Sequence, residues 1–174
     1  MNYMDRFRLD GRTALVTGGA RGIGFATCEA LAEAGAHVIL TDRDGDAAGA
    51  AAAKLREAGL NVTSDRLEVT DSADVERLAD KYPQVDLLVN NAGIARSNEP
   101  AETMSDETWN IVIDVNLNGL FWCCRSFGAR MLERGAGAIV NVGSMSGFVV
   151  NRTQEQAQYN ASKAAVHQLT RSLA

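Results

Sequence analysis

The chain alternates short apolar runs with longer segments of helical composition. The apolar runs predict strands over residues 13–17, 37–41, 85–89 and 138–142, and a loosely alternating segment predicts another over residues 61–69. The segments between and after them predict helices over residues 23–34, 46–58, 72–82, 106–134 and 157–174. Buried strands separated by helices are typical of a parallel sheet with crossover helices on both faces. The sequence therefore predicts a doubly wound α/β fold with three layers, α/β/α.

Residues that commonly begin or end helices stand at the edges of these segments. Gly35 and Gly59 follow the first two helices, and Ser105 is suited to cap the start of the long one. No repeat or linker interrupts the pattern, so we expect residues 1–174 to form one domain. The last predicted helix reaches the final residue without a glycine or proline to end it. We therefore expect a fragment, truncated after the fifth strand and the final helix.

Composition argues against several classes of protein. The net charge is −5, and no run of Lys or Arg offers a surface for nucleic acid. No apolar stretch approaches the ~18–20 residues of a membrane span, and the first ten residues contain no apolar signal segment. The cysteines, Cys28, Cys123 and Cys124, have the spacing of neither metal ligands nor a disulfide framework. We expect a cytoplasmic protein with no metal site and no membrane or nucleic-acid partner.

A glycine-rich turn joins the first strand to the first helix. Residues 17–24 read Thr-Gly-Gly-Ala-Arg-Gly-Ile-Gly. Glycines let the backbone approach a ligand closely, and free N–H groups at the start of a helix attract a pyrophosphate. Gly18, Gly22 and Gly24 at this place in a βαβ unit indicate a dinucleotide site of the Rossmann type.

Asp42 ends the second strand and bears on the choice of dinucleotide. An acidic side chain at this position accepts hydrogen bonds from the adenosine ribose and repels a 2′-phosphate, which favours NAD over NADP. Arg21 and Arg43 argue the other way, because either can pair with a 2′-phosphate. We expect NAD as the cofactor.

Tyr159 and Lys163 lie four residues apart, on one face of the last helix. The ordinary pKa of a tyrosine is about 10, and a nearby ammonium group stabilises the phenolate. The pair is suited to take a proton from an alcohol as hydride leaves the carbon. His167 follows one turn later with no partner in view, and His37 lies inside a strand. Both are interpreted as packed or exposed residues rather than bases.

Three further polar residues belong to the candidate site. Ser144 and Ser146 follow the fifth strand, where open α/β sheets place ligands, and a serine hydroxyl there can donate to a substrate oxygen. Asn116 falls on the apolar stripe of the long helix, so its amide must bond within the core or hold a water. That stripe comprises Trp109, Val112, Ile113, Leu120, Cys123, Phe127 and Met131.

Taken together, these motifs resemble the short-chain dehydrogenase/reductase family. Its motif TGxxxGIG matches residues 17–24, its motif NNAG matches residues 90–93, and its motif YxxxK matches Tyr159 and Lys163. The resemblance covers the whole chain. It implies an oxidoreductase that moves hydride between a nicotinamide dinucleotide and an alcohol or ketone carbon, on a chain of roughly 250 residues.

The resemblance also implies roles for individual residues. The family's Asp-Val pair near adenine is here Glu68-Val69, a departure at the first position. Asn116 is implied to position a water that links Lys163 to solvent. The implied cofactor contacts are Gly18, Arg21, Gly22, Ile23, Gly24, Asp42, Glu68, Val69, Asn91, Ala92, Gly93, Tyr159 and Lys163.

The two serines compete for one role. The family's common spacing, thirteen residues before Tyr159, selects Ser146, whereas the family's position at the strand end selects Ser144. The loop after these serines is longer than the commonest form, which explains the conflict. We take Ser144 as catalytic and Ser146 as a substrate contact.

Residues 143–152 and 159–171 are similar to bacterial sugar-alcohol (polyol) dehydrogenases of the galactitol type. The similarity implies that Asn151 faces the substrate together with Ser144, Ser146 and Tyr159, where polar groups suit a hydroxyl-rich chain. Two alternatives stay open: an NADPH-dependent 3-oxoacyl-carrier-protein reductase of the same fold, and a protein that senses NAD without turnover. Relatives are usually tetramers, so we expect a homotetramer.

Overall fold

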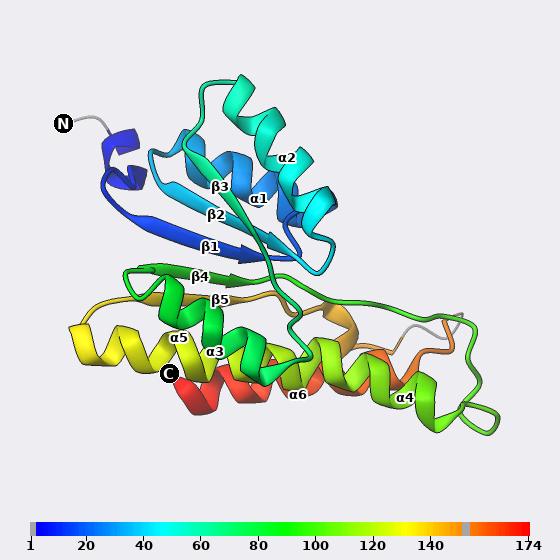
Figure 1. The fold of residues 1–174 in the computed structure, drawn as a ribbon. Coiled ribbons are helices and arrows are strands. Elements are labelled where there is room, and N and C mark those ends of the chain that lie inside the picture. The colour runs from blue at the N-terminus through cyan, green and yellow to red at the C-terminus, as the bar shows by residue number, and fades with distance from the viewer. Residues whose placement is uncertain (1–2, 151–153) are drawn as a thin grey trace.

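Five parallel strands form one sheet in the computed structural model, which describes residues 3–150 and 154–174 (Figure 1). The strand order is β3-β2-β1-β4-β5. The strands are β1 (Thr13–Thr17), β2 (His37–Asp42), β3 (Val62–Arg66), β4 (Leu87–Asn90) and β5 (Ala138–Asn141). The order reverses between β1 and β4, so the chain winds outward from this point in both directions. The predicted doubly wound α/β fold is confirmed.

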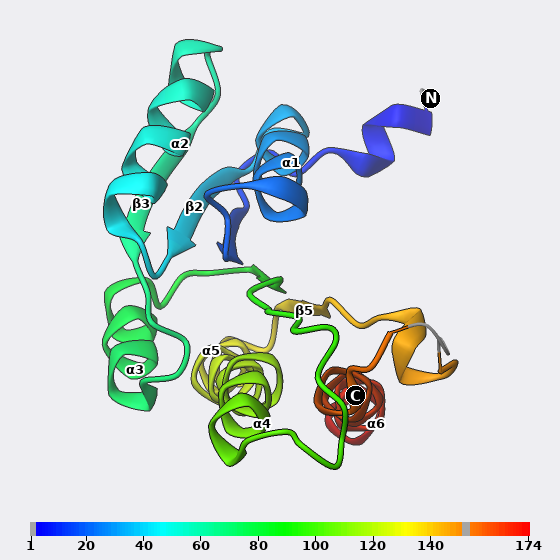
Figure 2. The ribbon, with the colours of Figure 1, turned by 90° about the vertical axis from the view of Figure 1, so that its right-hand side faces the viewer.

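Helices cover both faces of the sheet, as Figure 2 shows. On one face lie α1 (Gly22–Glu33) and α2 (Gly45–Glu57). On the other lie α3 (Ser72–Lys81), α5 (Leu120–Arg134) and α6 (Ala157–Leu173), with α4 (Asp106–Ile113) leading into α5. Short helical turns stand at η1 (Tyr3–Phe7) and η3 (Met145–Gly147).

Alternating side chains of the central strands divide the core between the two helical layers. Ala14 and Val16 of β1 join a buried cluster with α1 and α2, whereas Leu15 between them joins the cluster against α3 and α5. Along β2, Val38 and Leu40 likewise face one layer, and Ile39 faces the other. This two-sided burial explains why these strands appear in the sequence as continuous apolar runs.

Two strands differ from their predicted form. The apolar pattern predicted a strand to Val69, but β3 ends at Arg66, and residues 67–69 leave the sheet. We expected the fifth strand to be buried, yet β5 is the edge of the sheet, and Val140 is 57% exposed. Among the described residues, α1 and α2 lie over the half of one face formed by β1, β2 and β3, and no helix covers β5 on that side (Figure 2).

The long helix predicted over residues 106–134 is interrupted. Between α4 and α5, the segment η2 (Asp114–Gly119) is a π-helix, a wider turn that often marks a functional site. Asn116 lies within it and is completely buried. The predicted apolar stripe holds for most of its members, but Trp109 is 41% exposed, because α4 extends beyond the sheet.

Local signals at helix ends are largely confirmed. Gly35 and Gly59 have positive φ, as residues that end helices commonly do. Ser105 caps α4 by accepting a hydrogen bond from the amide of Thr108. The cysteines are buried and unpaired, and burial raises the pKa of Cys28 to about 12.

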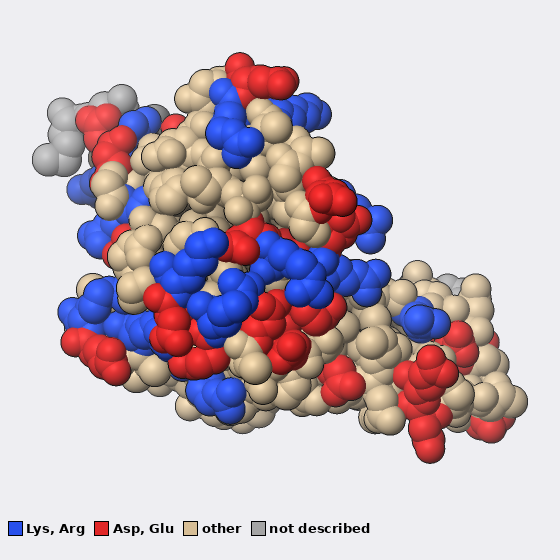
Figure 3. Space-filling view, in the orientation of Figure 1, with Lys and Arg blue, Asp and Glu red and all other residues tan. Residues whose placement is uncertain are grey.

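Charges of both signs intermingle on the face shown in Figure 3. Arg130 of α5 pairs with Glu76 and Asp80 of α3, and Lys81 of α3 pairs with Asp65 of β3. Within residues 3–150 and 154–174, every helix is too short or too polar to span a bilayer.

Candidate active site

The carboxyl ends of all five strands open into one cavity of about 530 Å³. It lies at the point where the strand order reverses, the usual ligand position in open α/β sheets. The predicted site residues in its wall are Gly18, Arg21, Ile23, Gly24, Asp42, Glu68, Val69, Asn91, Ala92, Gly93, Ser144, Tyr159 and Lys163. Residues far apart in the sequence are therefore brought together as the motifs required.

The glycine turn after β1 is packed too closely for side chains. Gly18 has a φ of 64°, and a Cβ there would stand 3.0 Å from the Cα of Ala92. A Cβ on Gly24 would overlap the carbonyl of Gly18, because α1 begins directly against the turn. Gly22, with a φ of 57°, permits the bend but lies outside the cavity wall. The bare backbone forms a cradle that a pyrophosphate fits.

The start of α1 differs from the starts of α2, α3 and α4. Those three are capped by Asp44, Asp71 and Ser105, whose side chains accept hydrogen bonds from first-turn amides. At α1, the residue in the capping position is Arg21, and no side chain accepts from the first turn. Amides at the start of α1 are thus left for an anionic ligand, whose charge the helix dipole favours.

Asn91 fixes the glycine turn against β4. Its Nδ2 donates to the carbonyls of Thr17 and Gly18, at 2.9 Å each. The hydroxyl of Thr17 in turn accepts from the amides of Asn91 and Ala92, at 3.1 and 3.0 Å. The NNAG segment therefore supports the central sheet through side chain and backbone alike.

Asp42 stands at the end of β2 with its carboxylate beside the glycine turn. It accepts from the amide of Ala20 at 3.3 Å and from the amide of Asp44 at 3.2 Å. These bonds hold the carboxylate at the cavity wall, where it can meet a ribose. Arg43 also lines the cavity, as does Arg21, so both signs of charge are present at this end.

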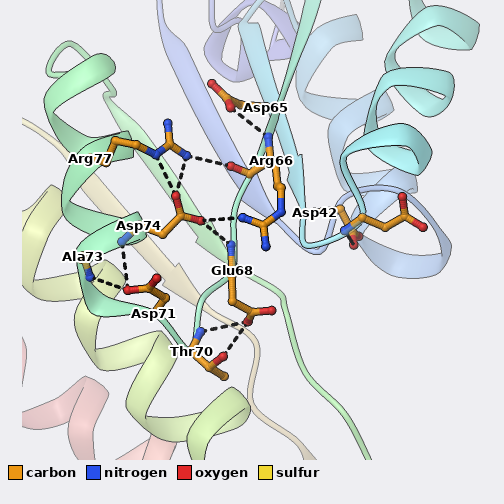
Figure 4. A network of polar contacts seen from close by, with 10 residues as sticks. Asp42, Asp65, Arg66, Glu68, Thr70, Asp71, Ala73, Asp74 and Arg77 are labelled. Atoms are coloured by element: carbon orange, nitrogen blue, oxygen red, sulfur yellow. Dashed lines mark hydrogen bonds and ion pairs between the residues drawn. The ribbon is translucent and has the colours of Figure 1, made fainter.

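Residues 67–69 leave β3 and form part of the cavity wall, beside the ionic network that Figure 4 shows. Asp74 of α3 accepts from the amide of Glu68 at 2.8 Å and pairs with Arg77 at 2.7 Å and Arg66 at 3.6 Å. Burial opposes the charge of Asp74, but these bonds outweigh it, so the pKa of Asp74 lies below its ordinary value. The carboxylate of Glu68 accepts from the amide and hydroxyl of Thr70.

Tyr159 and Lys163 both reach the cavity from α6. The Lys163 Nζ lies 5.8 Å from the centre of the Tyr159 ring and donates to the carbonyl of Val142 at 2.7 Å. Lys163 is 5% exposed, and burial lowers its pKa. No carboxylate is paired with it among the described residues, so its positive charge is available to the phenol.

Asn116 bonds within the core, one of the two possibilities predicted for it. Its Oδ1 accepts from the amide of Ile94 at 2.8 Å, and its Nδ2 donates to the Ile94 carbonyl at 2.9 Å and to Ser162 at 3.1 Å. The Ser162 hydroxyl donates to the carbonyl of Tyr159 at 2.7 Å. Asn116 therefore joins the loop after β4 to the helix that carries Tyr159. A water held at this position stays a prediction.

The two serines occupy different places. Ser144 lines the cavity. Its Oγ accepts a hydrogen bond from the amide of Ser146 at 3.1 Å, and Ser144 thereby caps the start of η3. Ser146 lies outside the wall. Asn151, the expected substrate contact, lies outside the described residues.

The histidines are both engaged. His167, for which the sequence offered no partner, accepts from the amide of Ser144 at 3.4 Å and stacks on Phe148. His167 is therefore a packed residue, and its partner was not visible in the sequence because it comes from a distant loop. His37 bonds to Thr63 at the other end of the sheet.

Sequence reasoning missed part of the wall. Each missed residue except Val115 directly follows a strand or a motif that was recognised, so position relative to the strand ends is the signal that finds them. Val115 lies in the π-helical turn, which the pattern did not predict. The missed residues are Leu67, Ile94, Ala95, Val115, Val142 and Gly143.

Comparison with known proteins identifies this class of site. The family model for short chain dehydrogenase matches residues 12–174. The chain is 51% identical to galactitol 2-dehydrogenase of Rhizobium johnstonii over 178 residues, covering all of this chain and 69% of that protein. It is 48% identical to galactitol 2-dehydrogenase (L-tagatose-forming) of Cereibacter sphaeroides, covering all of this chain and 68% of that one.

A solved structure agrees with this relationship. Gluconate 5-dehydrogenase from Burkholderia cenocepacia, in complex with NADP and tartrate, matches 99% of this chain and 68% of its own with a TM-score of 0.92 and 36% identity. The fold and site define a dinucleotide-dependent oxidoreductase that acts on CH–OH groups. The chain belongs to the short-chain dehydrogenase family.

Proposed function

We propose that this protein oxidises a secondary alcohol of a sugar alcohol to the ketone, with NAD as hydride acceptor and Tyr159 as acid/base. The observation that carries the proposal is the buried Lys163 ammonium, 5.8 Å from the Tyr159 ring centre, in a cavity at the strand ends. An unpaired ammonium at this place supports a phenolate in a way that a packing role does not require.

The proton transfer follows from these groups. Bound NAD supplies the acceptor for the hydride of the substrate carbon. The phenolate of Tyr159 takes the hydroxyl proton as the C–H electron pair leaves, and the hydroxyl oxygen becomes the ketone oxygen. The Ser144 hydroxyl donates to that oxygen, and the Lys163 charge stabilises the phenolate before it is protonated. In the reverse direction, Tyr159 returns the proton.

NAD rather than NADP is supported by Asp42. Its carboxylate, held by the amides of Ala20 and Asp44, suits two ribose hydroxyls and repels a 2′-phosphate. Arg43 and Arg21 in the same wall support the alternative, as does the NADP complex of the Burkholderia relative. Initial rates with NAD⁺ and NADP⁺ decide between the two.

A polyol substrate is supported by the relatives and by polar residues that follow β5 along the chain. The Rhizobium and Cereibacter relatives both carry the name galactitol 2-dehydrogenase. Ser144 lines the cavity, and Ser146, Asn151 and Gln154 come after it along the chain. An acyl chain would require an apolar wall instead. A homotetramer and a cytoplasmic location stay predictions.

The test uses the full-length enzyme and the Tyr159→Phe variant. We expect turnover of galactitol or sorbitol with NAD⁺, and a loss of at least about a hundredfold in kcat in the variant with little change in NAD binding. Faster reduction of an oxoacyl thioester with NADPH would favour the reductase alternative. Binding of NAD without turnover of any alcohol would favour the sensor. Activity that survives the substitution would contradict the role of Tyr159.

A further inference from the structure

His167 lies where the loop after β5 meets α6. The amide of Ser144 donates to its Nε2 at 3.4 Å, and its ring stacks on Phe148 with centroids 4.1 Å apart and planes 27° apart. Gly143 lies directly against the same ring, because a Cβ there would overlap Nε2. One side chain of α6 thus contacts three residues of the loop that carries Ser144.

The loop meets α6 at two further points. Lys163 donates to the carbonyl of Val142 at 2.7 Å. A Cβ on Gly147 would stand 2.8 Å from the amide of Ala164, so η3 lies directly on the helix one turn after Tyr159. The distance between the loop and the helix is therefore set at three points, by the bond from Lys163, by the absence of a side chain at Gly147 and by the ring of His167. Tyr159 and Lys163 lie on the same helix.

The hydrogen bond fixes the protonation of the ring. A backbone amide is only a donor, so Nε2 must be without a proton, and the proton of the neutral ring is on Nδ1. That Nδ1 is buried and has no hydrogen-bond partner among the described residues. A buried N–H without an acceptor is unfavourable, so this arrangement is not the one that stability alone would select.

Charged groups near the ring are few. The loop residues packed against it, 143–148, include no titratable side chain. Along α6, the charged residues four positions away are Lys163 and Arg171. The ring therefore acts as a neutral acceptor and a flat packing surface rather than as a member of an ion pair.

We propose that His167 is a positioning residue for Ser144. Its Nε2 and ring hold the loop against α6, and this contact fixes the position of the Ser144 hydroxyl relative to Tyr159 and Lys163. His167 lies outside the cavity wall, so we expect it to act through the serine rather than by contact with substrate or cofactor. The proposal rests on the proposed function, because it assumes that Ser144 contacts the reacting oxygen.

Two substitutions in the full-length enzyme separate the acceptor from the packing. His167→Gln keeps an acceptor at the distance of Nε2, and His167→Leu removes it. We expect His167→Leu to lower kcat on the order of tenfold with an unchanged Kd for NAD, and His167→Gln to retain most of the turnover. His37→Leu is the matched control, since it also removes a histidine hydrogen bond but at the opposite end of the sheet. It should leave kcat unchanged.

The primary deuterium isotope effect distinguishes positioning from loss of folded enzyme. A misplaced Ser144 slows the chemical step, so the isotope effect on kcat should rise in His167→Leu. A smaller fraction of folded protein lowers kcat without changing that effect. An unchanged isotope effect in His167→Leu, or equal losses in the Leu and Gln variants, would overturn the proposal. If the Leu variant does not fold, His167→Met, which also lacks a nitrogen acceptor, takes its place.

A double-mutant cycle with Ser144→Ala separates this proposal from the proposed function. The effect of the Leu substitution should disappear when Ser144 is already absent. If it persists at the same size, His167 does not act through Ser144, while the role of Tyr159 is untouched. If Ser144→Ala alone leaves kcat at the wild-type value, Ser144 has no catalytic role, and both that assignment and the positioning role fail.

Discussion

The two ends of the cavity are built on different principles. The half formed by β1, β2 and β3 holds its shape through close backbone contacts and through ion pairs. Gly24 against Gly18 is an example of the first, and Asp74 with Arg77 is an example of the second. The half formed by β4, β5 and α6 uses amides and hydroxyls, and among the described residues Lys163 is the one charged side chain of this half in the cavity wall.

The difference follows from the task of each end. The pyrophosphate of a dinucleotide is anionic, so a rigid backbone recess and free amides at a helix start are suited to bind it. Proton transfer needs a charge whose field is not cancelled. An acid beside Lys163 would neutralise the ammonium that supports the phenolate, whereas a carbonyl partner leaves it effective. We therefore expect substitutions at the α6 end to change activity without changing stability. Substitutions at the β1–β3 end are expected to change both.

The largest effect should come from Lys163→Met. Turnover should fall by about a thousandfold or more, because the phenolate loses its stabilising charge. Burial opposes the charge of Lys163 and lowers its pKa, so the substitution also removes the cost of burying an ammonium, and the free energy of unfolding should change by no more than about 1 kcal/mol. Kinetics and thermal unfolding of the same sample test both parts. A strongly destabilised variant would break the proposed separation.

Gly24→Ala should come next. The added methyl group would overlap the Gly18 carbonyl, so the turn must shift, and we expect NAD binding to weaken by about ten- to a hundredfold, equivalent to the 1–3 kcal/mol of local strain. Isothermal titration measures it. Gly49→Ala in α2 is the control, because nothing lies within 4 Å of its Cβ position. That variant should bind NAD normally and gain about 0.5–1 kcal/mol of stability. Equal NAD affinity in the two variants would contradict the assignment of the glycine turn as the NAD site.

Asp74→Asn should have the smallest effect on function. Loss of the charge loosens the loop at Glu68, so the KM for NAD should rise several-fold while kcat is unchanged. The lowered pKa of Asp74 means that its stabilising effect is complete above the pKa of the unfolded chain and is lost as the pH falls through the folded pKa. The variant should be about 1–3 kcal/mol less stable at neutral pH, with the difference closing in acid. Urea unfolding curves over a pH series measure this difference in the free energy of unfolding. A difference that stays constant in acid would contradict the assignment.

Much of the fold could be read from the sequence, because every strand except β3 is largely apolar and the motifs lie near strand ends. The wall residues that carry motifs, such as Gly18 and Tyr159, were found for the same reason. The end of β3 was missed because Leu67 and Val69 are apolar whether they lie in a sheet or against a ligand. The partner of His167 was missed because it depends on how closely the loop at Gly143 approaches α6, which no local pattern encodes.

The π-helical turn at residues 114–119 has one more consequence. A π-turn amounts to one inserted residue, and each residue of an α-helix rotates the next part of the helix by about 100°. The inserted residue thus changes the rotation of α5 about the helix axis relative to α4. As a result, α4 presents one face to α6 while α5 presents another to the sheet. Removing a single residue from this segment would rotate one helix against the other and carry Asn116 away from Ile94, so the length of this stretch is as constrained as its composition.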